Sequence, residues 1–247
     1  MGNCCASDRR VTRHHDRSDA HIAQRGNKCR RVVARRITER YETAVDVLAA
    51  LHRETLPEVL PLAPQITYAI PTFDIDAMLV EIGLMLEWYL PDRGVDPTNN
   101  IRAEFVMLWR DLLAKPAALP KTWVLRDFHS PNLIWLGERS GISKVGIIDF
   151  QDAVLGPAAY DLVSLLQDAR IDVPEQLELA LLTRYIKARH TADDTFDPAG
   201  FAEIYAIMSA QRNTRLLGTF ARLNRRDGKP QARTSTFPVE SQGIFSP

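Results

Sequence analysis

Cysteine is missing from most of this 247-residue chain, and so are long apolar runs. The three cysteines, Cys4, Cys5 and Cys29, all precede residue 30, so no disulfide can form within the rest of the sequence. No run approaches the roughly 18 consecutive apolar residues of a membrane-spanning helix. The first thirty positions are polar and charged where a secretory signal needs an apolar stretch. We therefore expect a cytoplasmic protein without a membrane partner.

Glycine and lysine are scarce before Trp123, which limits the ways in which this part could hold a phosphate. The glycines there are Gly2, Gly26, Gly83 and Gly94, and the lysines are Lys28, Lys115 and Lys121. This spacing gives no glycine-rich flap, and the phosphate-loop pattern Gly-x-x-x-x-Gly-Lys-Ser/Thr is absent. The sequence therefore excludes a phosphate-loop nucleotide-binding protein.

A net charge of zero conceals two differently composed parts. Residues 1–36 hold ten Lys and Arg against three Asp and Glu, whereas the remaining residues hold 21 against 28. The basic part shows no apolar periodicity, so residues 1–40 are predicted to be a disordered leader. A lipidated start, a zinc site and nucleic-acid binding are the three functional interpretations of this part. None is favoured, because the required Ser or Thr, the paired ligand spacing and the interleaved aromatic residues are missing.

From Tyr41 onward the apolar spacing predicts a mainly helical domain. The composition is 45% apolar, which is enough for a core. Apolar positions recur at helical spacing in six segments: 41–51, 77–90, a third before Pro116, 158–167, 174–189 and 201–223. Four prolines in Leu56–Phe73 exclude a regular helix and favour an extended connection. Residues 231–247 lose this periodicity and are predicted to be a disordered tail.

The stretch Trp123–Asp152 carries the chemistry. Leu133–Leu136 and Val145–Ile148 are short apolar runs joined by a turn-rich segment, so we expect a small β-hairpin. Such pairing brings Asp149, at the end of the second strand, beside Asn132, and Asp127 lies five residues before Asn132. Phosphoryl transfer from a magnesium nucleotide needs one carboxylate as base and further oxygen ligands for the metal. Turn and capping roles alone do not explain why all three coincide with the strand ends.

These residues resemble the aminoglycoside phosphotransferase and choline kinase family of the protein-kinase-like superfamily. The pattern Asp127-x-x-x-x-Asn132 followed by Ile148-Asp149-Phe150 is similar to the catalytic loop and metal-binding segment of that superfamily. Three further runs are most similar to bacterial kinases acting on the anomeric hydroxyl of N-acetylmuramate or N-acetylglucosamine: Leu125–Arg170, Phe220–Leu223 and Arg226–Lys229.

The resemblance implies a fold and a set of roles. Residues 41–230 would form the carboxy-terminal lobe of a kinase-like fold, mainly α, and the amino-terminal lobe with its phosphate flap would be largely absent. Asp127 would be the catalytic base, and Asn132 and Asp149 would bind ATP and Mg²⁺. Arg126 and Asp152 would contact substrate. Asp161 would brace the catalytic loop.

Several alternatives remain open at this point. The chain could be an inactive remnant or a binding module of the family, since a missing phosphate grip predicts little turnover by this chain alone. The small-molecule acceptor could be an aminoglycoside or a choline-like compound instead of a sugar. Nucleic-acid binding through the basic arm is a third reading, and the oligomeric state is left open.

Overall fold

The computed structural model describes residues 37–227, and the leader and tail predicted for residues 1–40 and 231–247 lie almost wholly outside this range. The chain divides after Glu39, and the unit described below is Arg40–Pro247. Within the described residues, no helix combines the length and the apolar character that crossing a membrane would require.

The first described helix spans residues 37–51, which includes the segment 41–51 that the apolar spacing predicts. Ala44 and Leu48 are buried in the main core, and Val47 and Leu51 pack against it. This helix therefore supplies one side of the core, through the stripe that its sequence indicated.

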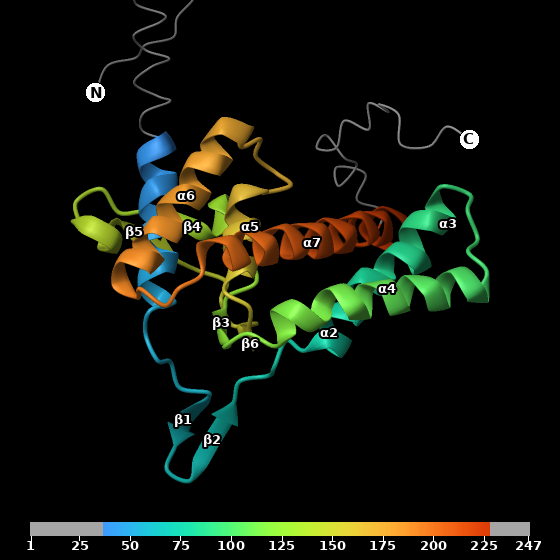
Figure 1. The fold of residues 1–247 in the computed structure, drawn as a ribbon, viewed down its shortest axis with the longest axis horizontal. Helices are drawn as coiled ribbons and strands as arrows, with labels where there is room; N and C mark the ends of the chain where they lie inside the picture. Colours follow the sequence, from blue (N-terminus) through green and yellow to red (C-terminus); the bar gives the residue numbers. More distant parts are fainter. Residues whose placement is uncertain (1–36, 228–247) are drawn as a thin grey trace, which may run out of the picture. The chain divides into compact units, whose positions relative to one another are not determined.

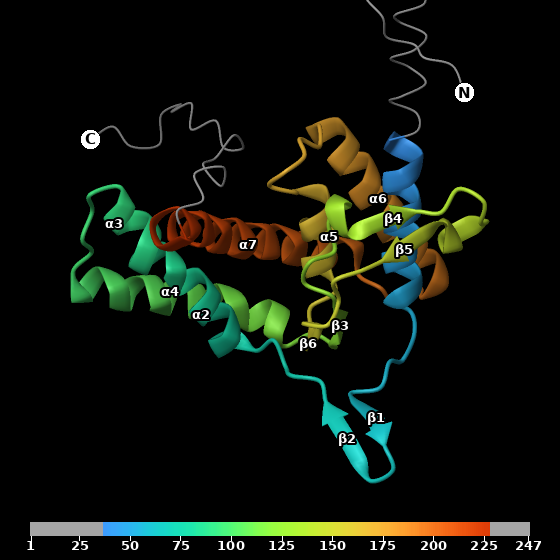
Figure 2. The same ribbon diagram turned by 180° about the vertical axis from the view of Figure 1, so that it is seen from behind.

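The proline-rich segment that follows forms a hairpin and not a plain extended connection, so this expectation was incomplete. Strand β1 (Val59–Ala63) pairs antiparallel with β2 (Ile66–Ala69), with an irregular register after Pro61. Pro61 is tolerated because each strand of a two-stranded sheet has a free edge, where a missing N–H need not break the pairing. The hairpin lies away from the helices in both ribbon views (Figures 1 and 2).

The second helical segment changes its winding before it ends. Helix α2 (Ile75–Leu84) is capped by Asp74, whose carboxylate accepts the Ala77 N–H at 2.9 Å. It continues as a π-helical turn, η1 (Met85–Tyr89), and then as α3 (Leu90–Asp92). The predicted segment 77–90 therefore extends two residues further, through Pro91 to Asp92. A π turn widens the backbone, and proline is accepted at the start of the next helical turn.

Helix α4 (Asn99–Ala117) begins at the cap residue Thr98 and contacts α2. Beyond it, two antiparallel strand pairs are nested along the chain. The outer pair joins β3 (Thr122–Val124) to β6 (Val154–Gly156), and the inner pair joins β4 (Leu133–Trp135) to β5 (Val145–Ile147). The inner pair confirms the predicted hairpin. The described residues contain two further two-stranded sheets, β1 with β2 and β3 with β6.

The core is centred on α5 (Ala159–Leu166), in which every residue is buried. Helices α6 (Glu175–Ala192) and α7 (Pro198–Asp227) pack against it, and the short 3-10 turns η2 (Ser130–Asn132) and η3 (Gly141–Lys144) complete the described elements. Figures 1 and 2 both show α7 running alongside α2 and α4.

The crossing of α7 with α2 is unusually close and depends on Gly218. A Cβ at this position would lie 2.3 Å from the Leu84 carbonyl carbon and 2.5 Å from its oxygen. Only a residue without a side chain therefore fits between the two backbones. The described part of the chain is mainly helical, as predicted. The absence of an amino-terminal lobe stays a prediction, because residues 1–36 lie outside the described range.

Candidate functional site

The nested strand pairs explain how residues far apart in sequence meet. β3 leads into the loop that carries Asp127, and β6 follows the loop that carries Asp149. Between them the inner pair aligns Leu133 with Ile147, and the Ile148 N–H donates to the Asn132 carbonyl at 3.1 Å. The register of four short strands therefore sets Asp149 beside Asn132.

Direct contacts join the three polar residues. The Asn132 side-chain amide donates to the backbone carbonyl of Asp127 at 3.0 Å and to the Asp149 carboxylate at 3.3 Å. The second Asp149 oxygen accepts from Gln151 at 2.8 Å. Asp127 and Asn132 are half-buried, and Asp149 is exposed. The site thus combines sheltered and solvent-facing oxygens.

This donor set fits Mg²⁺ in chemistry. A carboxylate and an amide oxygen are ligands of the hard kind that Mg²⁺ takes, and the ion commonly keeps waters and substrate phosphates in its other positions. The Asn132 amide presents its nitrogen to Asp149, so its oxygen would face a metal only after a half-turn of the amide group. No group of three His, Cys, Asp or Glu side chains suited to a metal occurs between residues 37 and 227. A metal bound at Asn132 and Asp149 would therefore need further ligands from substrate or water.

The backbone is strained on both sides of the site. Arg126, immediately before Asp127, has φ of +66°, and Asp149 has φ of +61°. These are left-handed conformations that disfavour residues with a side chain. The Asp127 N–H also donates to the Leu125 carbonyl at 2.8 Å, which makes Arg126 the centre of a γ-turn. Strain of this kind persists only where the surroundings hold it in place.

Asp161 of α5 is one of the groups that hold it. Its two carboxyl oxygens accept the backbone N–H groups of Leu125 at 2.6 Å and Arg126 at 2.9 Å. Burial raises the pKa of Asp161 to about 7, while these two hydrogen bonds and the charge of Arg212 act in the opposite direction. The geometry agrees with a bracing role, which stays a prediction until it is measured.

The two candidate substrate residues occupy different surroundings. The Arg126 guanidinium is turned towards α2, where it pairs with Glu81 at 2.5 Å. It also lies over the Phe73 ring, at 5.9 Å from the centroid. Asp152 is exposed in the turn between Asp149 and β6. Of the two, only Asp152 presents its side chain to solvent beside the site.

The sequence alone does not single out three residues that contact or adjoin the loop carrying Asp127. His129 is buried, its Nδ1 has no hydrogen-bond partner, and burial lowers its pKa. Ser164 donates to the Arg126 carbonyl at 3.2 Å, and buried Arg212 donates to Ser164 at 2.9 Å. The position of His129, two residues after Asp127, was a signal that could have marked it. Ser164 and Arg212 lie too far away in sequence to be linked to the loop in advance.

Two surface hollows lie elsewhere on the described residues. One, of about 290 Å³, is lined by residues that include Asp74, Arg110 and Lys121. The other, of about 470 Å³, includes Arg53 and Lys187. Neither is lined by the three polar residues of the loops, so neither identifies the acceptor site.

Comparison with known proteins places these features in a family. Residues 19–203 match the Phosphotransferase enzyme family, APH. The chain is 40% identical over 191 residues to an N-acetylmuramate/N-acetylglucosamine kinase of Caulobacter vibrioides, a match that covers 77% of this chain and 51% of that protein. Kinases of the same name match at 39% identity in Neisseria meningitidis, over 66% of this chain and 48% of that protein, and at 33% in Pseudomonas aeruginosa, over 78% and 54%.

The chain spans about half the length of the curated relatives that it matches. The matched region nevertheless covers Asp127, Asn132, Asp149 and the whole of α5. On the extent of this match, the chain belongs to the Phosphotransferase enzyme family.

Proposed function

We propose that this chain is the catalytic part of an ATP-dependent phosphotransferase that acts on a sugar hydroxyl, with a cell-wall amino sugar as acceptor. The observation that carries the proposal is the junction of two loops by nested strand pairs, with Asn132 in contact with both Asp127 and Asp149. Phosphoryl transfer depends mainly on positioning and on charge stabilisation, and this junction serves both purposes.

Asp127 is proposed as the base. The Asp127 carboxylate would orient the acceptor hydroxyl and accept its proton. The Asp127 backbone is fixed by two hydrogen bonds, since its carbonyl accepts from the Asn132 side-chain amide and its N–H donates to the Leu125 carbonyl. A half-buried carboxylate on a held backbone suits this task, because the direction of proton transfer is set before the acceptor binds.

Asn132 and Asp149 are proposed to hold Mg²⁺ together with the phosphates of ATP. The bound nucleotide would supply the phosphoryl group, and the ion would offset the charge on its oxygens. The exposed side of Asp149 leaves space for a phosphate, and Gln151 fixes the rotation of the Asp149 carboxylate through the hydrogen bond at 2.8 Å.

The acceptor is proposed from the names of the relatives, which are N-acetylmuramate/N-acetylglucosamine kinases at 33% to 40% identity. Of the two candidate substrate residues, Asp152 is exposed and would bind a sugar hydroxyl, whereas Arg126 would act only if its ion pair with Glu81 opened. The cytoplasmic location expected from the sequence stays a prediction.

An acceptor panel tests this function directly. The chain would be incubated at high concentration with radiolabelled ATP and, in separate reactions, N-acetylmuramate, N-acetylglucosamine, an aminoglycoside and choline, each with Mg²⁺ or with EDTA. We expect slow formation of sugar phosphate with the two amino sugars and none with EDTA. The low rate follows from the lack of a recognisable glycine-rich flap in the sequence.

Each other outcome has a definite meaning. Product from the aminoglycoside or choline alone would contradict the proposed acceptor while keeping the reaction. No product with any acceptor would contradict the proposed function and favour a binding module of the family. Rapid turnover would show that this chain grips the triphosphate by means that its sequence does not reveal.

A further inference from the structure

The strained turn at Arg126 needs partners that hold it, and the backbone partners described above account for only part of the restraint. Asp161 accepts the consecutive backbone N–H groups of Leu125 and Arg126, and the Ser164 hydroxyl donates to the Arg126 carbonyl. These hydrogen bonds do not restrain the Arg126 side chain. A contact between its guanidinium and another helix would restrain the turn, because Arg126 immediately precedes Asp127.

Glu81 of α2 holds that guanidinium. One Glu81 oxygen lies 2.5 Å from Arg126, and the side chains of Arg126 and Glu81 are only 27% and 12% exposed. An ion pair on the surface contributes little, whereas removing one partner from a shielded pair leaves an uncompensated charge. The contact is therefore costly to lose.

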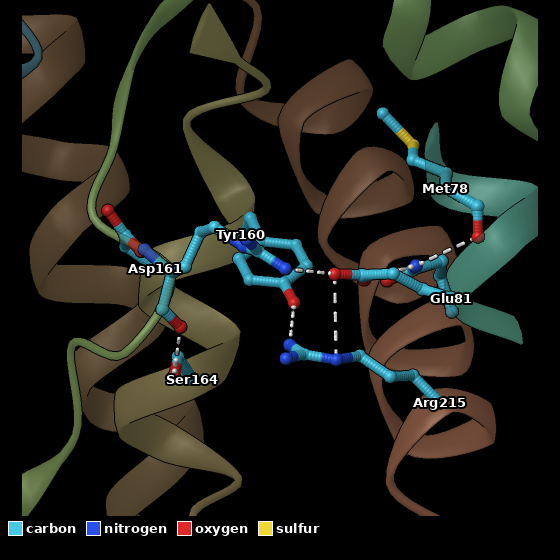
Figure 3. A network of polar contacts seen from close by, with 8 residues as sticks. Met78, Glu81, Tyr160, Asp161, Ser164 and Arg215 are labelled. Atoms are coloured by element: carbon cyan, nitrogen blue, oxygen red, sulfur yellow. Dashed lines mark hydrogen bonds and ion pairs between the residues drawn. The ribbon is translucent and has the colours of Figure 1, made fainter. Parts of the chain in front are cut away.

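Glu81 is itself fixed by α7, as Figure 3 shows. Arg215 approaches the same Glu81 oxygen at 3.5 Å and donates to the Tyr160 hydroxyl of α5 at 2.6 Å. Gln211 donates to the other Glu81 oxygen at 3.2 Å. The carboxylate thus cannot rotate away from Arg126 without giving up its contacts with α7.

We propose that Glu81 is a positioning residue for Asp127. It touches neither an acceptor nor a nucleotide, and it acts through Arg126 by keeping the γ-turn closed, so that the Asp127 carboxylate keeps one direction. The inference rests on the proposed function in that Asp127 is taken as the base. A misplacement of the order of 1 Å in a catalytic group can lower the rate about 100-fold, so a residue that fixes the turn has a large effect on turnover.

A purely structural role for Glu81 is the competing explanation. The carboxylate joins α2 to α7, so its loss could loosen the whole domain without a particular effect on the loop. The two explanations differ in which amide protons become exposed to solvent. Positioning predicts faster hydrogen exchange at Leu125, Arg126 and Asp127 alone, whereas general loosening also accelerates exchange in α5.

The test is amide hydrogen exchange, measured by NMR on the full chain and on Glu81→Gln, which keeps the shape of the side chain and removes its charge. Glu87→Gln is the matched control, since Glu87 lies six residues further on and is exposed. We expect exchange about 10-fold to 100-fold faster at Leu125, Arg126 and Asp127 in Glu81→Gln. This fold-change corresponds to the loss of one hydrogen bond to a charged group. Exchange at Leu162 and Leu165 in α5 should not change.

Arg126→Met removes the same ion pair from the other side and guards against poor folding of a single variant. It should accelerate the same three amides, and the double variant should add nothing further. The proposal is overturned if Glu81→Gln leaves these amides as slow as in the parent chain, or if α5 accelerates equally.

Kinetics provide a second reading. In the sugar phosphate assay, Glu81→Gln should lower kcat by about 10-fold to 100-fold and leave the acceptor KM unchanged, while Glu87→Gln keeps the parent rate. A change in KM alone would contradict positioning. If the parent chain forms no product, the proposed function fails, and the exchange experiment still decides the role of Glu81.

Discussion

Replacing Gly218 with alanine tests the close crossing of α7 and α2, which supports the contacts of Glu81. An alanine Cβ would lie 2.3, 2.5 and 2.6 Å from the carbonyl carbon, carbonyl oxygen and Cβ of Leu84. Real Cβ atoms essentially never come within 3.0 Å of another such atom, and two of these three atoms are backbone atoms that cannot rotate aside. The helices must therefore separate.

Two opposing effects set the magnitude. Alanine is favoured over glycine inside a helix by about 1 kcal/mol. Overpacking a fixed core costs about 1–3 kcal/mol, and a clash with backbone belongs at the upper end of that range. The net expectation for Gly218→Ala is a loss of about 2 kcal/mol in the free energy of unfolding. For a chain of this size that lowers Tm by about 4–8 °C.

Gly83→Ala is the matched control, because Gly83 lies in α2 and a Cβ there meets nothing within 4 Å. Only the propensity gain of about 1 kcal/mol then applies, so Tm should rise by about 2–4 °C. Both variants would be compared with the parent by thermal unfolding followed by circular dichroism. If Gly218→Ala is as stable as the parent, or more so, the close crossing is not as described.

Two further predictions concern buried titratable groups. Asp161→Asn keeps one acceptor oxygen and points an NH₂ group at the second backbone N–H, of Leu125 or Arg126, so urea denaturation should show a loss of about 1–3 kcal/mol; an unchanged midpoint would contradict the bracing contacts. Burial lowers the pKa of His52 to about 3, and its Nδ1 lies 2.7 Å from the Tyr185 hydroxyl, so the folded state keeps the ring neutral. The unfolded chain takes up a proton below about pH 6.5, so this group's contribution to stability should fall by about 2 kcal/mol between pH 7 and pH 5. His52→Gln should weaken that pH dependence, and an equal slope in the two proteins would refute the assignment.

The parts of the fold that follow from local spacing could be predicted. Met78, Ile82 and Leu86 recur at helical intervals, and all three are buried as that pattern indicates. The inner strand pair followed from two apolar runs around a turn. In both cases the neighbours that decide the structure lie within a few residues along the chain.

The parts that depend on distant contacts could not. Leu108 and Leu112 have the helical spacing of an apolar stripe on α4, yet they are 55% and 48% exposed, while neighbouring Leu113 is fully buried. Which face of a helix is covered depends on where other helices cross it. Likewise the π turn before Pro91 is a local solution that the apolar pattern does not encode.

The site divides in the same way. The spacing of Asp127 and Asn132 and the strand end at Asp149 could be recognised because chemistry at such a site requires those residue types. A single glutamate on an amphipathic helix is typical of a solvated face, so nothing in the sequence connects Glu81 to a loop that begins 44 residues later. The orientation of Glu81 depends on the crossing of α2 with α7, which is a tertiary feature.

The proposed role of Asp127 can be measured by comparing Asp127→Asn with Asp111→Asn, a matched change at an exposed position on α4. Both would be assayed beside the parent chain for Mg²⁺-dependent transfer from radiolabelled ATP to N-acetylglucosamine and N-acetylmuramate, with unfolding curves to confirm that each is folded. General-base catalysis contributes about 100-fold to 10,000-fold, so Asp127→Asn should lose at least about 100-fold in rate while Asp111→Asn keeps the parent rate. Transfer that is equally fast in folded Asp127→Asn would contradict the account of this loop as the centre of the reaction.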